Sequence, residues 1–352
     1  MTDSEIVKTR LINQQIAKTQ LMNPQEIVAW MAAMQAQEYA MAKWAIGLRL
    51  PGLKDEDVEK AFNDGAILRT HLMRPTWHFV TPADIRWMLA LTAPRVSAVN
   101  AYYYHKFELD TEIFKRSNDV IIKALQGGKQ LTRAILKSAL EQDGIIADGL
   151  RLSYIMMGAE LDGIICSGAR QGKQFTYALL DERVPPAKAL ERDEALAELT
   201  LRYFTSRGPA TLKDFSYWSG LTMKDAKEGI EMLRSHFVYE VINDQEYIFI
   251  PNKSNNEDEM QKTFLMPDYD EYGMSYKDRS AIFMSGDIIL ENQDGNTASN
   301  RMIIINGVIR GTWQWTVKNK AIEISTNPFT VLSEWENQAL NKAIKRYKAF
   351  AG

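Results

Sequence analysis

The sequence predicts an α+β protein that is mainly helical, and three observations support this class. The 352 residues exceed the ~250–300 at which one hydrophobic core stops growing, so several packed units are expected. An order of two or three short helices followed by a pair of strands recurs three times. The segment after residue 262 is rich in strand patterns and ends in a helix. Because helix, short helix, turn, helix and hairpin is the order of a winged helix-turn-helix, we predict three such units in tandem, then a C-terminal β-rich domain and a terminal helix.

The first unit, residues 1–108, is the longest. Helices are predicted near residues 4–18, 24–43 and 55–64, and strands at 66–72 and 76–80 with Arg74-Pro75 at the turn. The stretch from Ile27 to Met34 is apolar throughout, so its helix must be largely buried.

The second and third units, residues 109–190 and 191–262, repeat this order. Predicted helices at 111–125, 132–142 and 150–163 precede strands at 164–166 and 175–179. Predicted helices at 193–206, 212–218 and 222–233 precede strands at 236–242 and 246–251, with Asn243-Asp244 at the turn. The alternative is a generic α+β array in which the hairpins only cover helices.

The C-terminal part, residues 263–352, follows a polar and acidic linker at 252–261. Strands are predicted at 281–283, 288–291, 301–305, 308–317 and 321–325, with turns at Asp294-Gly295 and Asn306-Gly307. The final helix, 331–350, has a basic end from Lys342 to Lys348, which suits the negative C-terminal end of the helix dipole.

Composition excludes several classes of protein. Apolar residues at 45% and charged residues at 25% are typical of a globular chain. The polar start and the short apolar runs predict neither a signal peptide nor a membrane span, so we expect a cytoplasmic protein. We also expect it to be a monomer. Cys166 is the single cysteine and cannot form a disulfide within the chain. Gly-rich phosphate loops, HExxH, paired-cysteine spacing and GxSxG are absent from the sequence, which disfavours metal, nucleotide and serine-hydrolase chemistry.

Charge is distributed unevenly along the chain. The net charge is −3, so a nucleic-acid partner would have to be held by a local basic patch. Residues 66–107 hold five basic residues and one acidic residue. A solvated face is the alternative explanation of that segment.

Two glutamines, Gln35 and Gln37, end the apolar stretch, and their amides require hydrogen-bond partners. If the helix continued through them, residues two apart would point to different sides. Both amides therefore meet at one site only if the helix ends or distorts there. Glu38 is the nearest carboxylate and an alternative general base.

Polar side chains on the predicted hairpins are candidates for DNA contact. The first hairpin could enter a groove or hold phosphates through Arg69, Arg74, Thr76 and His78. A surface hairpin with Trp77 and Phe79 as an aromatic plug is the alternative. The hairpin of the second unit offers Arg170, Lys173 and Gln174.

A charged block follows Met266-Pro267. We favour a salt-bridged corner between the third unit and the β-rich domain as its explanation. DNA contact is the alternative, with Tyr276, Lys277 and Arg279 as candidates.

Four segments in order, MQAQEYAMAKWAIGLRL, ILRTHLMRPTWHFVTPADIRWML, FLMPDYDEYGMSYKDRS and NGVIRGTWQW, resemble the AlkZ/YcaQ-type winged-helix DNA glycosylases. The resemblance extends from about residue 11 to residue 350. It implies three tandem winged helices with a C-terminal β domain, and removal of N7-alkylated purines, in some members from interstrand crosslinks. It also implies that Gln35-Ala36-Gln37 is the catalytic Gln-x-Gln motif. The chain departs from the family pattern at His71, where Trp is common, and at Pro75, where Gly is common; proline stiffens this turn.

Neutral amides suit such a substrate. Glutamine cannot act as a general acid or base, but an N7-alkylated purine already carries a positive charge and leaves as a neutral base. Two amides that orient water and sugar could then suffice, at ~10²–10³-fold per well-placed group. We therefore predict a monofunctional DNA glycosylase that acts on double-stranded DNA with alkylated bases and needs no metal or cofactor. A non-catalytic winged-helix regulator is the alternative from a different class, although none of the predicted third helices is strongly basic. A third possible function is that of an inert scaffold for protein interactions.

Overall fold

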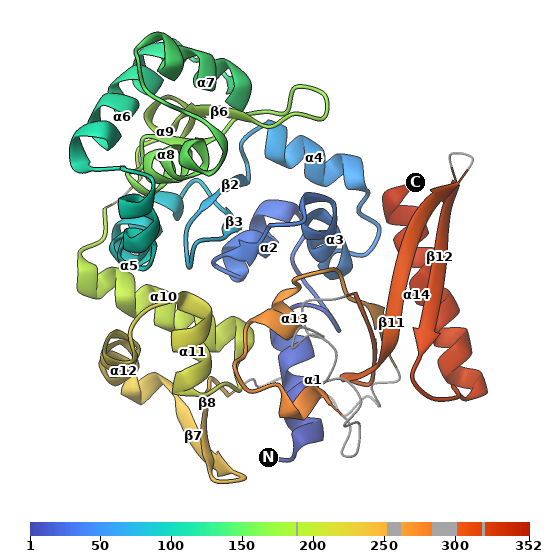
Figure 1. The fold of residues 1–352 in the computed structure, drawn as a ribbon. Helices are drawn as coiled ribbons and strands as arrows, with labels where there is room; N and C mark the ends of the chain where they lie inside the picture. The colour runs from blue at the N-terminus through green and yellow to red at the C-terminus, as the bar shows by residue number, and fades with distance from the viewer. Residues whose placement is uncertain (188, 252–261, 284–300, 319–320) are drawn as a thin grey trace. The chain divides into compact units, whose positions relative to one another are not determined.

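The computed structural model describes residues 1–187, 189–251, 262–283, 301–318 and 321–352. These residues form two compact units. Unit 1 comprises 1–59, 197–218 and 222–352, and unit 2 comprises 60–196 and 219–221. The α+β class and the β-rich C-terminal region are confirmed (Figure 1). The four-part division of the chain stays a prediction, as does the winged-helix geometry of the three helical units.

The N-terminal part of unit 1 is helical. Its elements are α1 (Asp3–Asn13), α2 (Pro24–Trp30), the short strand β1 (Met34–Gln35), α3 (Tyr39–Arg49) and the start of α4 (Asp55–Asn63), which belongs to unit 2 from residue 60. Thr2 and Glu5 form a capping box at the start of α1, and Asn23 caps α2 with Pro24 as its first residue. The prediction of one helix over 24–43 is wrong, because the backbone between α2 and α3 leaves the helical conformation for eight residues.

The middle part of unit 1 has the predicted order of three helices and a hairpin. Its elements are α10 (Arg192–Arg207), which belongs to unit 1 from residue 197, α11 (Leu212–Ser219), which does so up to residue 218, α12 (Met223–Met232), the 3₁₀ turn η1 (Arg234–His236), β7 (Val238–Ile242) and β8 (Gln245–Phe249). Asn243 and Asp244, the two residues of the hairpin turn, have positive φ values of 49° and 62°, as a type I′ turn requires.

The C-terminal part of unit 1 contains a four-stranded antiparallel sheet in the order β12-β11-β10-β9. Its elements are β9 (Thr263–Leu265), α13 (Glu271–Met274), η2 (Ser280–Ile282), β10 (Met302–Ile305), β11 (Val308–Lys318), β12 (Ala321–Pro328) and α14 (Glu334–Ala351). The predicted turn at Asn306-Gly307 is confirmed, with φ values of 52° and 89°. The predicted strand at 281–283 is wrong, since these residues fall at the 3₁₀ turn η2 and its C-cap. The linker 252–261, the strand 288–291 and the turn Asp294-Gly295 lie outside the described residues.

Aromatic side chains attach α14 to the rest of unit 1. Tyr347 packs edge-on against Trp44 of α3 and Trp313 of β11, with ring centroids 5.1 and 4.8 Å apart. The indole nitrogens of Trp44 and Trp313 donate to the carbonyl oxygens of Leu265 and Met266, both at 2.8 Å. Buried Trp side chains with their N–H satisfied fix the helix on the sheet.

Unit 2 contains two antiparallel hairpins and the helices around them. Its elements are β2 (Leu68–His71), β3 (Trp77–Val80), α5 (Ile85–Lys106), α6 (Thr111–Leu125), β4 (Leu131–Thr132), α7 (Arg133–Gln142), α8 (Gly149–Leu161), β5 (Ile165–Ser167), β6 (Thr176–Leu179) and α9 (Leu180–Arg183). In the first hairpin Arg69 is opposite Phe79 and Thr70 is opposite His78. The predicted helices of the second unit are present within two residues of their expected ends. Helix α5, which the sequence analysis did not predict, is 22 residues long.

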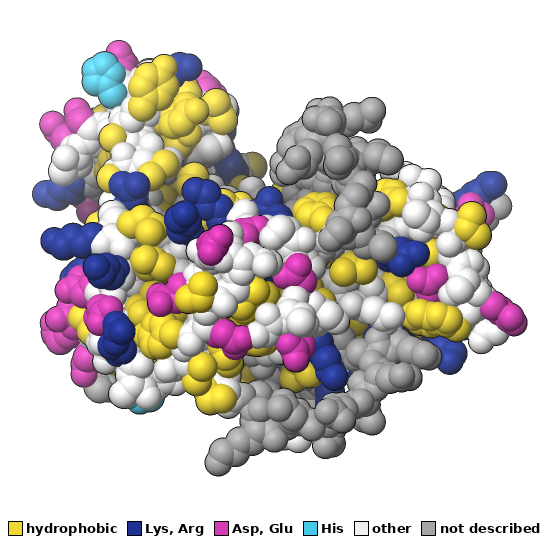
Figure 2. Space-filling view, turned by 90° about the horizontal axis from the view of Figure 1, so that it is seen from below, with side chains coloured by type: hydrophobic (Ala, Val, Ile, Leu, Met, Phe, Trp, Pro, Cys, Tyr) yellow, Lys and Arg dark blue, Asp and Glu magenta, His cyan; other side chains and the backbone are white. Residues whose placement is uncertain are grey.

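Acidic and basic side chains are interspersed on the face shown in Figure 2, as a near-neutral net charge implies. No described helix has the length and hydropathy needed to cross a bilayer. Within the described ranges, no group of three or more His, Cys, Asp or Glu residues has the geometry to hold a metal ion.

Candidate active site

Gln35 and Gln37 lie together in unit 1, on the segment that links α2 to α3. Helix α2 ends at Trp30, Gln35 ends the short strand β1 and Gln37 is in the bend that follows, so helical spacing does not separate the two side chains. The side-chain nitrogen of Gln35 donates to Oε1 of Gln37 at 2.5 Å. Gln35 is 6% exposed, whereas Gln37 is exposed. The non-helical backbone therefore removes the difficulty that a continuous helix would have created, and the pair has one member at the surface.

Arg207, at the end of α10, holds the backbone just before this pair. Its guanidinium donates to the carbonyl oxygens of Met31 at 2.9 Å and Ala33 at 2.8 Å. Between them, Ala32 has a φ of 57°, a left-handed conformation that L-residues adopt at a cost. Two hydrogen bonds from a buried cation, one on each side, stabilise this turn.

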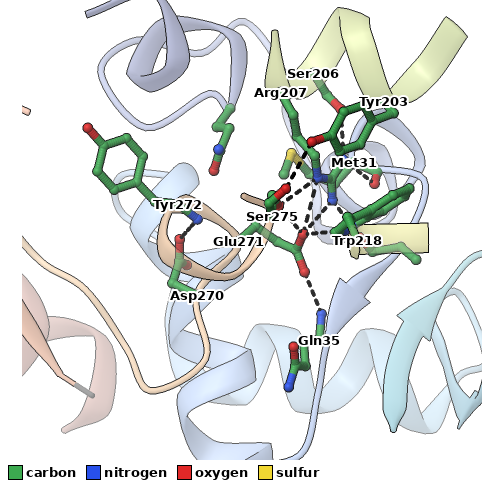
Figure 3. Close-up of polar contacts among 12 residues, drawn as sticks. Met31, Gln35, Tyr203, Ser206, Arg207, Trp218, Asp270, Glu271, Tyr272 and Ser275 are labelled. Atoms are coloured by element: carbon green, nitrogen blue, oxygen red, sulfur yellow. Dashed lines mark hydrogen bonds and ion pairs between the residues drawn. The ribbon is translucent and has the colours of Figure 1, made fainter. Parts of the chain in front are cut away.

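Glu271, the first residue of α13, holds the segment from its other end. Its Oε1 accepts the backbone N–H of Gln35 at 2.8 Å. Its Oε2 accepts from Arg207 at 2.7 Å, from the indole of Trp218 at 2.9 Å and from the hydroxyl of Ser275 at 2.7 Å (Figure 3). Arg207 is fully buried and Glu271 is 1% exposed.

The pKa of Glu271 is set by two opposing effects. Burial raises the pKa, but the charge of Arg207 and the hydrogen bonds from Arg207, Gln35 and Ser275 outweigh burial and lower the pKa of Glu271 to about 2. Glu271 is therefore a charged, fully hydrogen-bonded carboxylate at neutral pH.

A second buried ion pair lies one residue away on the chain. Asp270 accepts two parallel hydrogen bonds from Arg49, at 2.9 and 3.1 Å, and both side chains are fully buried. The other partners of Arg49 are the backbone and side chain of Gln14 and the carbonyl oxygen of Ala45. Of the predicted salt-bridged corner between the third unit and the β-rich domain, the Glu271–Arg207 pair is confirmed, whereas Asp270 pairs with Arg49 of the predicted first unit.

The three predicted DNA contacts of this charged block have different environments. Tyr276 is fully buried: its hydroxyl donates to the carbonyl oxygen of Arg207 at 2.7 Å and its ring lies 3.6 Å from the Arg10 guanidinium. The prediction that Tyr276 contacts DNA is therefore wrong, because this side chain is part of the core. Arg279 is half-buried and donates to Gly273 and Tyr217. Lys277 is exposed.

Glu38, the alternative base, is exposed beside Gln37 and occupies the N-cap position of α3 without a side-chain capping bond.

Unit 2 has a separate basic region built on its two hairpins. The Arg69 guanidinium lies over the rings of Trp77 and Phe175, 4.3 and 4.7 Å from their centroids. It lines a cavity of about 640 Å³ that we call the Arg69 pocket. The pocket is lined by Arg69, Trp77, Thr132, Arg133, Ala134, Lys137, Leu152, Lys173, Gln174, Phe175 and Tyr177. Three of the predicted DNA contacts, Arg69, Lys173 and Gln174, thus share one cavity whose lining holds four cations and no carboxylate.

The remaining predicted residues of unit 2 lie outside this lining. Arg170 is half-buried and stacks on Phe175, 4.7 Å from its centroid. Arg74 is half-buried at the turn, with a φ of 53°, and the hydroxyl of half-buried Thr76 donates to the carbonyl oxygen of Met73. His78 is fully buried and donates from Nδ1 to the carbonyl oxygen of Thr76 at 3.0 Å. The prediction that His78 grips DNA is wrong, because its side chain points into the core.

The two departures from the family pattern have structural consequences in the first hairpin. His71 is hydrogen-bonded to Glu160 through Nδ1, and its ring packs at a tilt against Trp77, with ring centroids 4.4 Å apart. Pro75 is exposed at the turn. The histidine thus keeps a ring contact with Trp77 and adds a hydrogen bond to Glu160.

Sequence reasoning missed the roles of Arg207, Trp218 and Glu271. An arginine at the end of a helix is explained by the helix dipole, and Glu271 is one acidic residue in a charged block. Neither pattern indicates a bond to the backbone of Gln35, which is distant in sequence.

Comparisons with known proteins agree with this fold. A model of the family described as DNA glycosylase AlkZ-like matches residues 28–350, and the chain belongs to this family. An interstrand DNA cross-link repair glycosylase of Streptomyces sahachiroi is 25% identical over 206 residues, which are 56% of this chain and 54% of that protein. The chain thus matches about half the length of this relative.

A solved structure is similar over nearly the whole chain. The Streptomyces sahachiroi DNA glycosylase AlkZ has a TM-score of 0.79 and 18% identity, with 99% of this chain and 96% of that chain covered. At this identity the likeness supports a shared fold.

Proposed function

We propose that this protein is a monofunctional DNA glycosylase that hydrolyses the N-glycosidic bond of cationic, N7-alkylated purines in double-stranded DNA. The observation that carries the proposal is the hydrogen-bonded pair of Gln35 and Gln37, one member buried and one exposed, in a chain of the AlkZ-like family. The name of the relative from Streptomyces sahachiroi extends the proposal to bases in interstrand crosslinks.

The proposed chemistry depends on the leaving group. An N7-alkylated purine leaves as a neutral base, so no acid is needed to protonate it. The amides then position the attacking water and the sugar, and their dipoles are fixed before the reaction because Gln35 donates to Gln37. The buried Arg207–Glu271 pair holds the backbone that carries both side chains.

Basic side chains of both units are proposed to hold the phosphates. In unit 2 these are Arg69 and Lys173 with Gln174 in the Arg69 pocket, together with Arg74, Thr76 and Arg170. In unit 1 they are Lys277 and Arg279. Each lost lysine or arginine contact would reduce the slope of log affinity against log salt by about 0.9.

The test uses duplex DNA with a single N7-methylguanine and, as a control, the same duplex with unmodified guanine. After incubation with the protein, alkaline cleavage reports base loss. We expect cleavage at the modified position alone. Tight binding to particular sequences without base release from any cationic adduct would favour the regulator, and failure to bind DNA at low salt would favour the scaffold.

A further inference from the structure

A second basic hollow lies in unit 1, where the C-terminal helix α14 meets β9 and the segment that follows α1. We call it the α14 pocket. It has a volume of about 330 Å³. It is lined by Gln15, Ile16, Ala17, Lys18, Thr19, Arg49, Pro51, Lys262, Thr263, Phe264, Ala339, Lys342, Ala343 and Arg346. The lining contains five cationic side chains and no carboxylate.

Four of these cations keep their charge unpaired. Arg49 is neutralised by Asp270, but Lys18, Lys262, Lys342 and Arg346 form no ion pair with any described residue. The side chains of Lys262 and Arg346 donate hydrogen bonds to uncharged backbone carbonyl groups instead. Nζ of Lys262 donates to the carbonyl oxygen of Ala17 at 2.6 Å, and Arg346 donates to the carbonyl oxygens of Gly47 at 3.2 Å and Leu48 at 2.5 Å. Like charges gathered in one hollow repel each other unless an anion joins them.

Two buried polar atoms of the lining have no hydrogen-bond partner among the described residues. They are Nε of Arg346 and Oγ1 of Thr263. Burial lowers the pKa of Arg346, and no neighbouring carboxylate opposes this effect. Unsatisfied buried polar groups are costly, so these two groups add to the local demand for hydrogen-bond acceptors beside the four cations.

The helix dipole accounts for only part of this arrangement. It favours cations on any side of the last turns of α14, and Lys345 and Lys348 are exposed outside the lining. Lys342 and Arg346, in contrast, are four residues apart on one helix face and line the pocket. The dipole does not explain why Lys18 and Lys262, from other parts of the chain, meet them there.

We propose that the α14 pocket binds a phosphate-bearing anion, through Lys18, Lys262, Lys342 and Arg346. A guanidinium and ammonium groups form charge-assisted hydrogen bonds to phosphate oxygens. The volume equals that of roughly ten water molecules, so it admits two linked phosphate groups. The phosphates belong either to a free small molecule or to a nucleic-acid strand.

The first arm of the test uses pyrophosphate. Isothermal titration of the full chain at constant ionic strength should show binding that Lys342→Ala and Arg346→Gln each weaken about tenfold or more. Lys345→Ala, which removes a lysine from the same helix outside the pocket, is the matched control and should bind as wild type does. Lys342 is exposed, so its variant remains informative if Arg346→Gln fails to fold.

The second arm identifies the source of the phosphates. Affinity for undamaged duplex DNA is measured against salt for wild type, Lys342→Ala and Lys345→Ala. A slope that falls by about 0.9 in Lys342→Ala alone supports a DNA phosphate in the pocket. An unchanged slope together with weakened pyrophosphate binding supports a free ligand. If Lys342→Ala matches Lys345→Ala in both arms, the pocket is not an anion site.

Discussion

Two arginine–carboxylate pairs meet at the start of α13, and they differ in what else they hold. Arg49–Asp270 and Arg207–Glu271 are both buried, and each has short hydrogen bonds. The first pair binds Gln14 and the backbone of α3. The second binds the carbonyl oxygens of Met31 and Ala33 and the N–H of Gln35.

The comparison shows that burial of an ion pair does not identify a functional role. Breaking a buried pair by removing one partner is costly wherever the pair lies. Only the backbone groups that Arg207 and Glu271 hold connect their pair to the proposed chemistry of Gln35 and Gln37. The following predictions separate the contribution of each pair to folding from its contribution to activity.

The largest expected effect is on stability, and it is similar for both pairs. Asp270→Asn and Glu271→Gln each leave a buried arginine without its counter-ion. We expect each to lower the free energy of unfolding by about 3–5 kcal/mol, measured by urea denaturation at pH 7. A loss below about 1 kcal/mol in one variant alone would show that the two pairs are not equivalent in folding.

The next effect is on the rate of base release, and it should distinguish the pairs. Under single-turnover conditions where both variants are folded, Glu271→Gln should slow release of N7-methylguanine about 10²-fold, because a displaced Gln35 misplaces the amides. Asp270→Asn should retain the wild-type rate, since its pair does not hold this segment. Equal rates in the two variants would remove the special role of the Arg207–Glu271 pair.

A smaller effect is expected in the acid dependence of stability. The pKa of Glu271 is lowered from 4.5 in the unfolded chain to about 2 in the folded protein. The ionised carboxylate therefore stabilises the folded state fully above pH 4.5, and this contribution is lost as the pH falls toward 2. This single group contributes on the order of 3 kcal/mol over that window. Urea denaturation between pH 5 and pH 3 should therefore show a steeper loss of stability in wild type than in Glu271→Gln. Parallel pH profiles would contradict the lowered pKa.

Local patterns predicted much of the fold. Capping residues and hydrophobic periodicity placed α6, α7 and α12 within a residue or two, and Asn243-Asp244 and Asn306-Gly307 placed two hairpin turns. Helix α5 was missed. Its apolar residues surround the helix instead of forming one stripe, so periodicity gave no signal.

The candidate site was predicted in its residues but not in its geometry. Gln35 and Gln37 stood out as amides at the end of an apolar run. The two side chains meet because the helix ends after Trp30, and hydrogen bonds from Arg207 stabilise that break. Arg207 is distant in sequence, so no local pattern predicts this contact. His78 and Tyr276 were misassigned for the same reason, because tertiary packing buries polar side chains that a strand or loop pattern leaves ambiguous.

The central claim is that neutral amides, and not a carboxylate, perform the hydrolysis of a cationic base. It is tested most directly by single-turnover release of N7-methylguanine by Gln37→Ala and Glu38→Gln, two exposed neighbours on the same segment. We predict a loss of about 10²–10³-fold in Gln37→Ala and the wild-type rate in Glu38→Gln. A wild-type rate in Gln37→Ala with a large loss in Glu38→Gln would contradict the claim and make Glu38 the general base.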